Sequence, residues 1–543
     1  MNGNPHYNPY PSHRSVTYGK NGMVATSQPL AAQAGLDILK KGGNAIDAAI
    51  ATAACLTVVE PTSNGIGGDA FAIVWFKNEM HGLNASGPAP NAISIEKVKA
   101  LKDAEGNQLE KMPTFGWTPV TVPGAPSAWA ALSKKFGKLP LSEVLEPAIR
   151  YAKEGYPVSP ILGYFWRSAY EFYKGKMNEA AFEEWHKTFA PNGRAPKIGE
   201  MITLANHAKT LEEIGQTNAE SFYRGALANK MVEASQKADG FLSHEDLANY
   251  QPEWVDPVNM NYRGYDVWEL PPNGQGIIAL SALNILKEFS FTTRDSTDTV
   301  HKQVEALKIA FTAGKKAITD PKMMTQNQID ALLGDEFAKK ASTQINEQAL
   351  NAEDCDLAKG GTVYLCTADS EGNMVSYIQS NYMGFGSGIV IPDTGIAMQN
   401  RGADFSLDQS HANALAGGKK TYHTIIPGFL TKDGQGIGPF GVMGGYMQPQ
   451  GHVQVIMNTI DFALNLQMAL DAPRFQWLAG KKIEVEKSFP THLAAELAAK
   501  GHDVNIALSS GSFGRGQIIW RDLESGVLSG ATESRCDGSV VAY

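Results

Sequence analysis

The stretch that decides the fold is Gly360-Gly-Thr-Val-Tyr-Leu-Cys-Thr-Ala368, with Asp369-Ser-Glu-Gly-Asn373 and Met374-Val-Ser-Tyr-Ile-Gln-Ser380 directly after it. Residues 362–368 and 374–380 are rich in β-branched and aromatic side chains, whereas residues 369–373 are typical of a turn. This pattern predicts a β-hairpin. A flexible Gly-Gly pair therefore stands immediately before a threonine that begins a strand.

Hydrophobic periodicity on both sides of this hairpin predicts helices and further short strands. Helices are expected at 29–41, 45–59, 125–136, 141–155, 207–215, 276–288, 300–314 and 451–470, and strands at 70–76, 482–485 and 516–520. The helix at 45–59 is apolar nearly all round, which is typical of a helix buried between layers. Residues 123–314 are interpreted as mostly helical, and the charged, Gln/Asn-rich residues 320–353 as an exposed or mobile segment.

Composition places the chain among globular proteins and excludes several classes of partner. Of its 543 residues, 43% are hydrophobic and 19% charged, which is enough to bury a sizeable core. The net charge is −9 and no Lys/Arg block could follow a phosphate backbone, so nucleic acid is not expected as a partner. The most apolar stretch, 45–59, is shorter than the roughly 20 residues that cross a bilayer, so no membrane partner is expected.

Cysteine use and the N-terminal residues favour a cytoplasmic location. Cys55, Cys355, Cys366 and Cys536 are scattered singly, which predicts neither a disulfide framework nor a cysteine-based metal site. Residues 1–20 lack the charged start and apolar centre of a secretory signal. The chain also lacks H-E-x-x-H, G-x-x-x-x-G-K-[ST] and G-x-S-x-G motifs. We therefore expect no metal, no cofactor and no serine-esterase chemistry.

Many segments, taken in chain order, are similar to motifs of the γ-glutamyltranspeptidase family of N-terminal nucleophile (Ntn) hydrolases. They lie at 23–32, 42–49, 60–69, 122–125, 140–160, 270–276, 361–362, 385–388, 400–405, 444–445 and 530–531. The resemblance implies an α+β fold, the four-layer αββα sandwich. It also implies a precursor that divides into residues 1–361, with the helical middle, and residues 362–543. The two subunits would form one intertwined catalytic domain, alone or as a dimer of heterodimers.

The family's chemistry implies that the Gly-Gly-Thr sequence is the site of self-cleavage. The Thr362 hydroxyl would attack the carbonyl of Gly361, and small residues there allow the strained turn that cleavage needs. The freed α-amino group, with an ordinary pKa of about 7.7–8.0, could then act as the base for the hydroxyl of the same residue. The resemblance assigns the oxyanion donors to Gly444 and Gly445 and the support of the nucleophile to Ser380. An ordinary turn and a sheet-surface serine are the alternative interpretations.

Recognition of the substrate is where the chain departs from the family. Asp404 matches the aspartate that binds the substrate's α-amino group, and a carboxylate suits an ammonium group. The family arginine that pairs with the α-carboxylate should fall near Ser86, where the chain has no arginine. The bidentate clamp for that carboxylate is therefore missing.

Further departures fall around the same acyl pocket. The family's Ser-Ser pair becomes His423-Thr424, its Gln or Glu becomes Arg401, and its Asn on the second hairpin strand becomes Tyr382. One hypothesis is that Arg401 and His423 replace the missing grip and keep a γ-glutamyl specificity. Another is that the pocket takes a different acyl group, such as glutaryl, as in the related cephalosporin acylases. Arg401 as a solvated loop residue and His423 as a packed core residue are the plainer interpretations.

The sequence therefore predicts an autoprocessing amidohydrolase or acyltransferase that cleaves small γ-glutamyl amides through a Thr362 acyl-enzyme. A glutaryl amidase of the cephalosporin acylase type is the alternative, and an unprocessed homologue that only binds ligand is the second. Poly-γ-glutamate depolymerases are also relatives, but the absent signal segment speaks against a cell-surface role. The loop at 405–420 is shorter than the lid of many relatives, which favours an open cleft for bulky amides.

Overall fold

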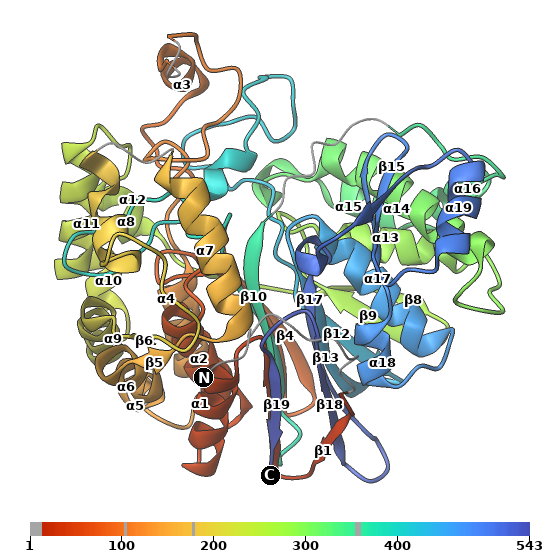
Figure 1. Ribbon diagram of the computed structural model, residues 1–543, viewed down its shortest axis with the longest axis horizontal. Helices are drawn as coiled ribbons and strands as arrows, with labels where there is room; N and C mark the ends of the chain where they lie inside the picture. The colour runs from red at the N-terminus through yellow and green to blue at the C-terminus, as the bar shows by residue number, and fades with distance from the viewer. Residues whose placement is uncertain (1–13, 103–105, 176–179, 353–359) are drawn as a thin grey trace.

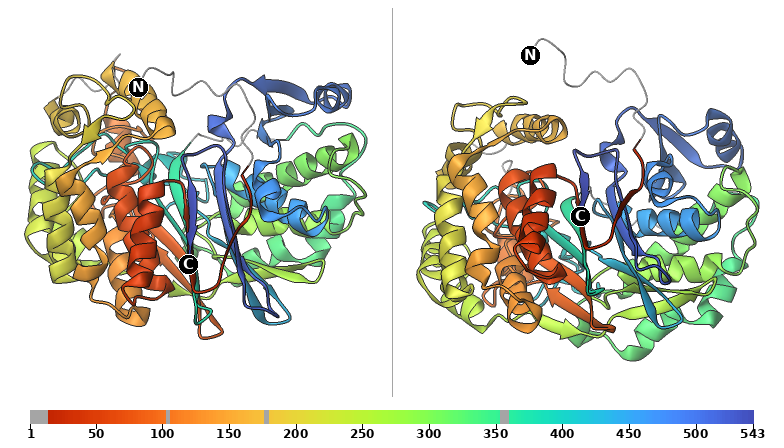
Figure 2. Two further views of the ribbon diagram at one scale, coloured as in Figure 1. Left: turned by 60° about the horizontal axis from the view of Figure 1, so that its bottom comes forward. Right: turned by 90° about the horizontal axis from the view of Figure 1, so that it is seen from below.

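The computed structural model describes residues 14–102, 106–175, 180–352 and 360–543. Two seven-stranded sheets lie face to face in the centre, and helices cover the outer face of each sheet (Figure 1). The views in Figure 2 show the same four layers, with the two sheets between the two groups of helices. This arrangement confirms the predicted αββα sandwich.

The first sheet carries the predicted hairpin at its centre. Its order is β19-β2-β10-β11-β3-β4-β7. The strands are β19 (Ser539–Ala542), β2 (Gly22–Thr26), β10 (Gly361–Asp369), β11 (Met374–Tyr382), β3 (Asp69–Phe76), β4 (Glu79–Ala85) and β7 (Glu253–Val255). Strands from both predicted subunits alternate here, because β10 and β11 lie between β2 and β3. The two parts of the chain therefore share one sheet.

Residues 123–314 are mostly helical, as predicted, but they also contribute two short strands to the second sheet. Its order is β1-β18-β17-β13-β12-β9-β8, and its last two strands come from that segment. The strands are β1 (Thr17–Gly19), β18 (Leu528–Thr532), β17 (Arg515–Arg521), β13 (Gln435–Met443), β12 (Gly428–Lys432), β9 (Tyr265–Glu269) and β8 (Val258–Tyr262). The strands β8 and β9 are only five residues each, too short for periodicity to separate them from the surrounding helices.

The helices of the N-terminal half lie outside the first sheet, apart from the one at Ile95–Ala100, which packs against residues 405–415. They are α1 (Pro29–Lys40), α2 (Ala45–Val59), α3 (Ile95–Ala100), α4 (Ala125–Phe136), α5 (Leu141–Val144), α6 (Glu146–Glu154), α7 (Pro160–Lys174), α8 (Glu183–Phe189), α9 (Ala205–Thr217), α10 (Glu220–Arg224), α11 (Ala226–Lys237) and α12 (His244–Asn249). Every residue of α2 is buried, as predicted, and a capping box of Asn44 and Asp47 begins it. The helix predicted at 141–155 is divided at Leu145, before Pro147 removes a backbone donor.

The helices outside the second sheet correct two further predictions. They are α13 (Gly276–Leu286), α14 (Thr297–Ala317), α15 (Gln326–Leu333), α16 (Asp335–Ser342), α17 (Met447–Ile460), α18 (Leu466–Asp471) and α19 (Thr491–Ala499). Residues 320–353 are not simply an exposed segment, because α15 and α16 lie there and Ala338 and Ala341 are buried in the core. The helix predicted at 451–470 is two helices, which a turn after Ile460 separates. A small sheet of β14 (Phe475–Ala479), β15 (Lys482–Glu486) and β16 (Asp503–Ala507) packs beside them.

Two further predictions concern membrane-crossing helices and the cysteines. None of the described helices combines the length and the apolar character that a membrane crossing requires. Cys55, Cys366 and Cys536 are buried free thiols, and Cys355 lies outside the described residues. Burial raises the pKa of each of the three thiols well above its ordinary value, so all three stay protonated and act as small apolar side chains.

Candidate active site

Thr362 lies at an irregularity in the central hairpin. The pairing of β10 with β11 shifts between Gly361 and Val363, so a bulge falls on the threonine. The residue is buried, at 1% exposure. Its Oγ1 lies 2.7 Å from the carbonyl oxygen of Gly361 and 3.1 Å from the Oγ of Ser380. The bulge thus places the hydroxyl against the peptide bond that precedes it.

Ser380, near the end of β11, holds the same carbonyl oxygen. Its Oγ donates to the oxygen of Gly361 at 2.7 Å and accepts from the backbone N–H of Tyr382 at 2.8 Å. Two hydroxyls therefore converge on one carbonyl group. Such donors polarise the C=O bond and stabilise the negative charge that develops on oxygen when a nucleophile attacks carbon. The structure thus brings together Thr362, Ser380 and Gly361.

Gly444 and Gly445 form the turn between β13 and α17. Their φ angles are 138° and 59°, in the region that favours glycine. A Cβ atom at Gly360 would lie 3.3 Å from the Cα of Gly445, so the turn adjoins the peptide before the nucleophile. Among the described residues, neither N–H of the pair has an acceptor. The turn also precedes the N-terminus of α17, whose dipole favours negative charge. The pair is placed to serve an oxyanion.

The residues assigned to the acyl group form one buried cluster around Asp404. Its Oδ1 accepts from the hydroxyls of Tyr382 at 3.0 Å and Tyr446 at 2.9 Å, and its Oδ2 lies 3.4 Å from Arg401 Nη1. The same guanidinium nitrogen donates to Thr424 Oγ1 at 2.9 Å, and the guanidinium lies over the Tyr382 ring, 4.0 Å from its centroid. Tyr382, Arg401 and Thr424 are at most 1% exposed. In the uncleaved chain these side chains pack against one another.

His423 faces Asp69 and lies beneath this cluster. Its Nε2 is 3.1 Å from Asp69 Oδ2, and both residues are fully buried. Burial raises the pKa of Asp69 to about 7, against hydrogen bonds from Gln399 and backbone N–H groups. Burial, and then the charge of Arg401, lower the pKa of His423 well below its ordinary value. Burial therefore favours the uncharged form of both side chains. His423 is packed in the core in the uncleaved chain, and its role in binding substrate stays a prediction.

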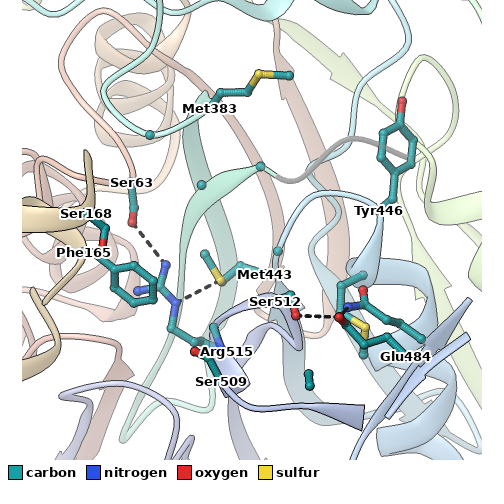
Figure 3. A pocket seen from close by; sticks show the side chains of 18 of the residues that line it. Ser63, Phe165, Ser168, Met383, Met443, Tyr446, Glu484, Ser509, Ser512 and Arg515 are labelled. Atoms are coloured by element: carbon teal, nitrogen blue, oxygen red, sulfur yellow. Dashed lines mark hydrogen bonds between the residues drawn. The ribbon is translucent and has the colours of Figure 1, made fainter. Parts of the chain in front are cut away.

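Two cavities lie near the hairpin and have Met383 as a common lining residue. The larger, of about 890 Å³, reaches Gly361 and Gly444 at one end, and Figure 3 shows its walls. The smaller, of about 650 Å³, is lined by Asp404 and Tyr382.

Sequence reasoning gave no role to Arg515 and Ser63, which line the larger cavity, or to Glu60, which contacts Arg515. Arg515 donates from Nη1 to Glu60 Oε1 at 2.8 Å and from Nη2 to Ser63 Oγ at 3.1 Å. Glu60 and Ser63 lie in the segment 60–69, which carried the family resemblance without a chemical assignment. The signal for Arg515 was weaker, because a single arginine at the start of a strand is ordinary in sequence. The position near Ser86 is buried and holds a serine–asparagine hydrogen bond, so no cation lies there.

A second buried cluster of titratable side chains lies between α14 and the turn that precedes β16. His301, Glu305 and His502 each place a ligand atom within 4.8 Å of the others. His301 Nδ1 lies 2.8 Å from His502 Nε2, and the ammonium group of Lys308 lies 2.7 Å from Glu305 Oε1. That ammonium group already supplies the positive charge the carboxylate requires. Burial lowers the pKa of His502 to about 3, so its ring stays neutral in this hydrogen-bonded network. We assign no ion to it.

The αββα sandwich and a threonine hydroxyl behind a Gly-Gly pair define an enzyme of the Ntn amidohydrolase class. The model of the γ-glutamyltranspeptidase family matches residues 31–543, and the chain belongs to that family. A glutathione hydrolase-like YwrD proenzyme of Bacillus subtilis is 35% identical over 96% of this chain and 98% of its own length. An oxamate amidohydrolase proenzyme of Klebsiella pneumoniae is 32% identical over 97% of this chain and all of its own.

The solved structures agree with this assignment. A cephalosporin acylase from Bacillus halodurans superposes with a TM-score of 0.95, at 59% identity, and the match covers 99% of each chain. The family, the α+β fold and the hydrolase class predicted from the sequence are thereby confirmed.

Proposed function

We propose that the chain cleaves itself between Gly361 and Thr362 and then hydrolyses small amides through Thr362. The observation that carries this proposal is the pair of hydroxyls, from Thr362 and Ser380, on the carbonyl oxygen of Gly361. In the first reaction, Thr362 Oγ bonds to the Gly361 carbonyl carbon and the C–N bond breaks, which gives an ester and a free α-amine. Water then hydrolyses the ester and leaves Gly361 as a carboxylate.

Turnover repeats this chemistry on a substrate. The α-amine of Thr362 takes the proton of its own hydroxyl, the oxygen attacks the substrate carbonyl, and the proton passes to the leaving amine. The N–H groups of Gly444 and Gly445 would hold the oxyanion. Water resolves the acyl-enzyme in hydrolysis, and an acceptor amine does so in transfer. Thus the chain itself supplies nucleophile, base and oxyanion donors.

The acyl group that we propose first is γ-glutamyl. Asp404 keeps acceptor capacity on Oδ2, where Arg401 lies at 3.4 Å, so a substrate ammonium group has a carboxylate oxygen to bind. The relatives include a protein named glutathione hydrolase-like. Arg401 would share this carboxylate with the substrate.

A second candidate, the glutaryl group, follows from the same contact. Arg401 already gives Asp404 a positive partner, and a glutaryl group has no ammonium group to compete for it. The solved structure at 59% identity is a cephalosporin acylase. The γ-glutamyl and glutaryl groups differ only in that ammonium group, so a direct comparison separates them.

The division into residues 1–361 and 362–543 would leave one particle. The strands β10 and β11 of the small subunit stay hydrogen-bonded to β2 and β3 of the large one on both sides. A native mass measurement distinguishes one heterodimer from a dimer of heterodimers. We propose that neither subunit is stable without the other.

Two measurements test the function. Intact mass under denaturing conditions should show two fragments, the smaller beginning at Thr362, and the Thr362→Ala variant should remain one chain. The matured enzyme should then release p-nitroaniline from the γ-glutamyl or the glutaryl anilide. A wild-type chain that stays uncut and inactive after long incubation would instead be the unprocessed, ligand-binding homologue. Cleavage of the chain with no turnover of either anilide would refute the substrate assignment alone.

A further inference from the structure

Arg515 lines the larger cavity, which Gly361 and Gly444 also line. It begins β17 and pairs in register with Met443, the residue immediately before the Gly444–Gly445 turn. The guanidinium lies 5.2 Å from the Phe165 ring centroid, and Figure 3 shows it at the cavity wall between Ser63 and Met443. A fixed positive charge therefore stands beside the proposed oxyanion site.

The guanidinium keeps hydrogen-bond donors for a ligand. Nη1 donates to Glu60, Nη2 to Ser63, and Nε lies 3.3 Å from Met443 Sδ. Each terminal nitrogen carries two hydrogens, so one on each nitrogen has no acceptor among the described residues. Two such donors suit the two oxygens of a carboxylate. Its side chain is 11% exposed, so the cavity reaches it while water is largely excluded.

Glu60 fixes the guanidinium without using all of its donors. Its Oε1 takes one N–H of Arg515, and its Oε2 accepts from Ser27 Oγ at 2.5 Å. Burial raises the pKa of Glu60, and the charge of Arg515 acts against that rise. An arginine stays charged at every working pH, so the cavity keeps its positive end. Glu60 therefore fixes the position of the guanidinium and leaves other N–H groups of Arg515 available to a ligand.

The other wall of the cavity would repel an anion. Glu484 accepts from Gln476 at 2.8 Å, from Ser512 at 3.0 Å and from Asn505 at 3.1 Å, all neutral donors. No described Lys or Arg pairs with it. A carboxylate of the substrate is therefore attracted to the end where Arg515 lies and repelled from the end where Glu484 lies.

Apolar side chains complete the cavity between these two charges. The α7 residues Tyr164, Phe165 and Phe172 line one side, and Ile506 and Leu508 line the rim opposite. Leu508 is 89% exposed, which is unusual for a large apolar residue unless a ligand or partner covers it. The cavity thus suits a molecule with an apolar body and a carboxylate near the scissile bond.

We propose that Arg515 binds a carboxylate of the substrate in this cavity, so that the enzyme selects amides bearing a carboxylate near the bond that is cleaved. The proposal rests on the proposed amidase function and names a residue that the family pattern did not supply. The carboxylate can belong to the acyl half or to the amine half of the amide. Arg515 would then supply the carboxylate recognition that the missing arginine near Ser86 leaves open.

The experiment uses the matured enzyme and two pairs of substrates. In the acyl arm, glutaryl p-nitroanilide is compared with its methyl ester, which lacks the negative charge. In the amine arm, the leaving group is 5-amino-2-nitrobenzoate or uncharged p-nitroaniline, on one acyl group. The readout is the ratio of kcat/KM for the charged member to that for the neutral member. A ratio cancels the amount of active enzyme, so partial misfolding does not change it.

The variants are Arg515→Gln, which removes the charge, and Arg515→Lys, which keeps the charge and the pair with Glu60 but loses the two parallel N–H donors of the guanidinium. Arg521→Gln, at the far end of the same strand, is the matched control. We expect the ratio in one arm to fall at least about tenfold in Arg515→Gln, less in Arg515→Lys, and not in the control, since hydrogen bonds to charged groups carry that much free energy. The arm that responds identifies the half of the substrate that carries the carboxylate.

Ratios unchanged in both arms for Arg515→Lys and Arg515→Gln would overturn the proposal, and Arg515→Lys alone decides if Arg515→Gln does not fold. Calorimetry with glutarate and 5-amino-2-nitrobenzoate gives the same comparison without turnover. Binding that depends on Arg515 in a protein without amidase activity would refute the proposed function and support this site. Equal binding by wild type and Arg515→Lys would refute the site.

Discussion

Replacement of Ser380 with alanine should slow self-cleavage far more than it affects folding. The Ser380 hydroxyl donates to the carbonyl oxygen of Gly361 at 2.7 Å, and so does the hydroxyl of Thr362. When Thr362 attacks, its own oxygen becomes part of the new bond and its proton leaves. Ser380 is then the side-chain hydroxyl that still donates to the developing oxyanion.

The expected size of the effect follows from that change of charge. In the ground state the lost hydrogen bond is worth about 1 kcal/mol, because the carbonyl oxygen is neutral. In the transition state the oxygen is anionic, and loss of one such donor slows an enzyme by about 10²–10³-fold. We therefore expect self-cleavage of Ser380→Ala to be slower than wild type by about that factor, with Ser380→Thr close to wild type.

The assay follows the fraction of intact chain by mass spectrometry over time at one temperature. Ser376→Ala is the matched control, because Ser376 lies on the same strand, is equally buried, and bonds to the Tyr364 hydroxyl at 2.6 Å. Both variants lose one buried hydroxyl contact, so both lose similar folding stability. Self-cleavage of Ser380→Ala at the wild-type rate, or equal slowing in both variants, would refute the reasoning.

Three further outcomes are expected. Gly445→Ala should retain the fold and lose turnover, because its φ of 59° strains a side chain beside the oxyanion donors; Gly434→Ala, at φ 73° in open space, should keep turnover in the same anilide assay. Asp69→Asn should lose stability in urea unfolding as pH falls from about 7 to 4, because the lowered pKa of His423 gives stability that is present above its unfolded pKa of about 6.5 and lost below it. The stability of the wild type should change less with pH over this range. The raised pKa of Asp69, about 7, makes the folded state bind a proton as pH falls, which adds stability and offsets the loss from His423; parallel pH profiles would contradict this. Arg401→Gln should raise the ratio of γ-glutamyl to glutaryl anilide turnover, because the substrate ammonium group would no longer compete with Arg401 for Asp404. An unchanged ratio would contradict this competition.

Local sequence predicted the elements whose signals are strong over a short range. The hairpin at 362–380 was predicted because its strands are rich in β-branched and aromatic residues around a clear turn. The helix Ala45–Val59 was predicted because it is apolar nearly all round. The five-residue strands β8 and β9 were missed, since too few residues carry their alternating pattern. The helices α15 and α16 were missed because burial of Ala338 and Ala341, rather than composition, orders that segment.

Part of the candidate site was also predicted from the sequence, whereas other contacts of its residues were seen only in the structure. Thr362, Ser380, Gly444 and Gly445 were predicted by position in the family pattern, and the structure places the threonine and serine on one carbonyl oxygen. The roles expected for Arg401 and His423 as substrate-binding residues stay predictions. In the uncleaved chain Arg401 pairs with Asp404, and His423 pairs with Asp69 in the core. Arg401 and Asp404 are three residues apart on one short 3-10 helix, so their pairing follows from local backbone geometry. The contact of His423 with Asp69 joins segments far apart in the chain and leaves no signal in the sequence.

The amino-acid sequence was enough to identify the family and the hairpin and to predict Thr362 as the residue that attacks, because these depend on neighbours in the chain and on an ordered series of motifs. The tertiary structure alone decided which side chains face the cavity beside that residue. Arg515 and Glu60 are separated by hundreds of residues and meet only because the start of β17, in the second sheet, lies against the segment after α2. Long-range pairing of charges depends on the packing of whole layers, and no local pattern records it.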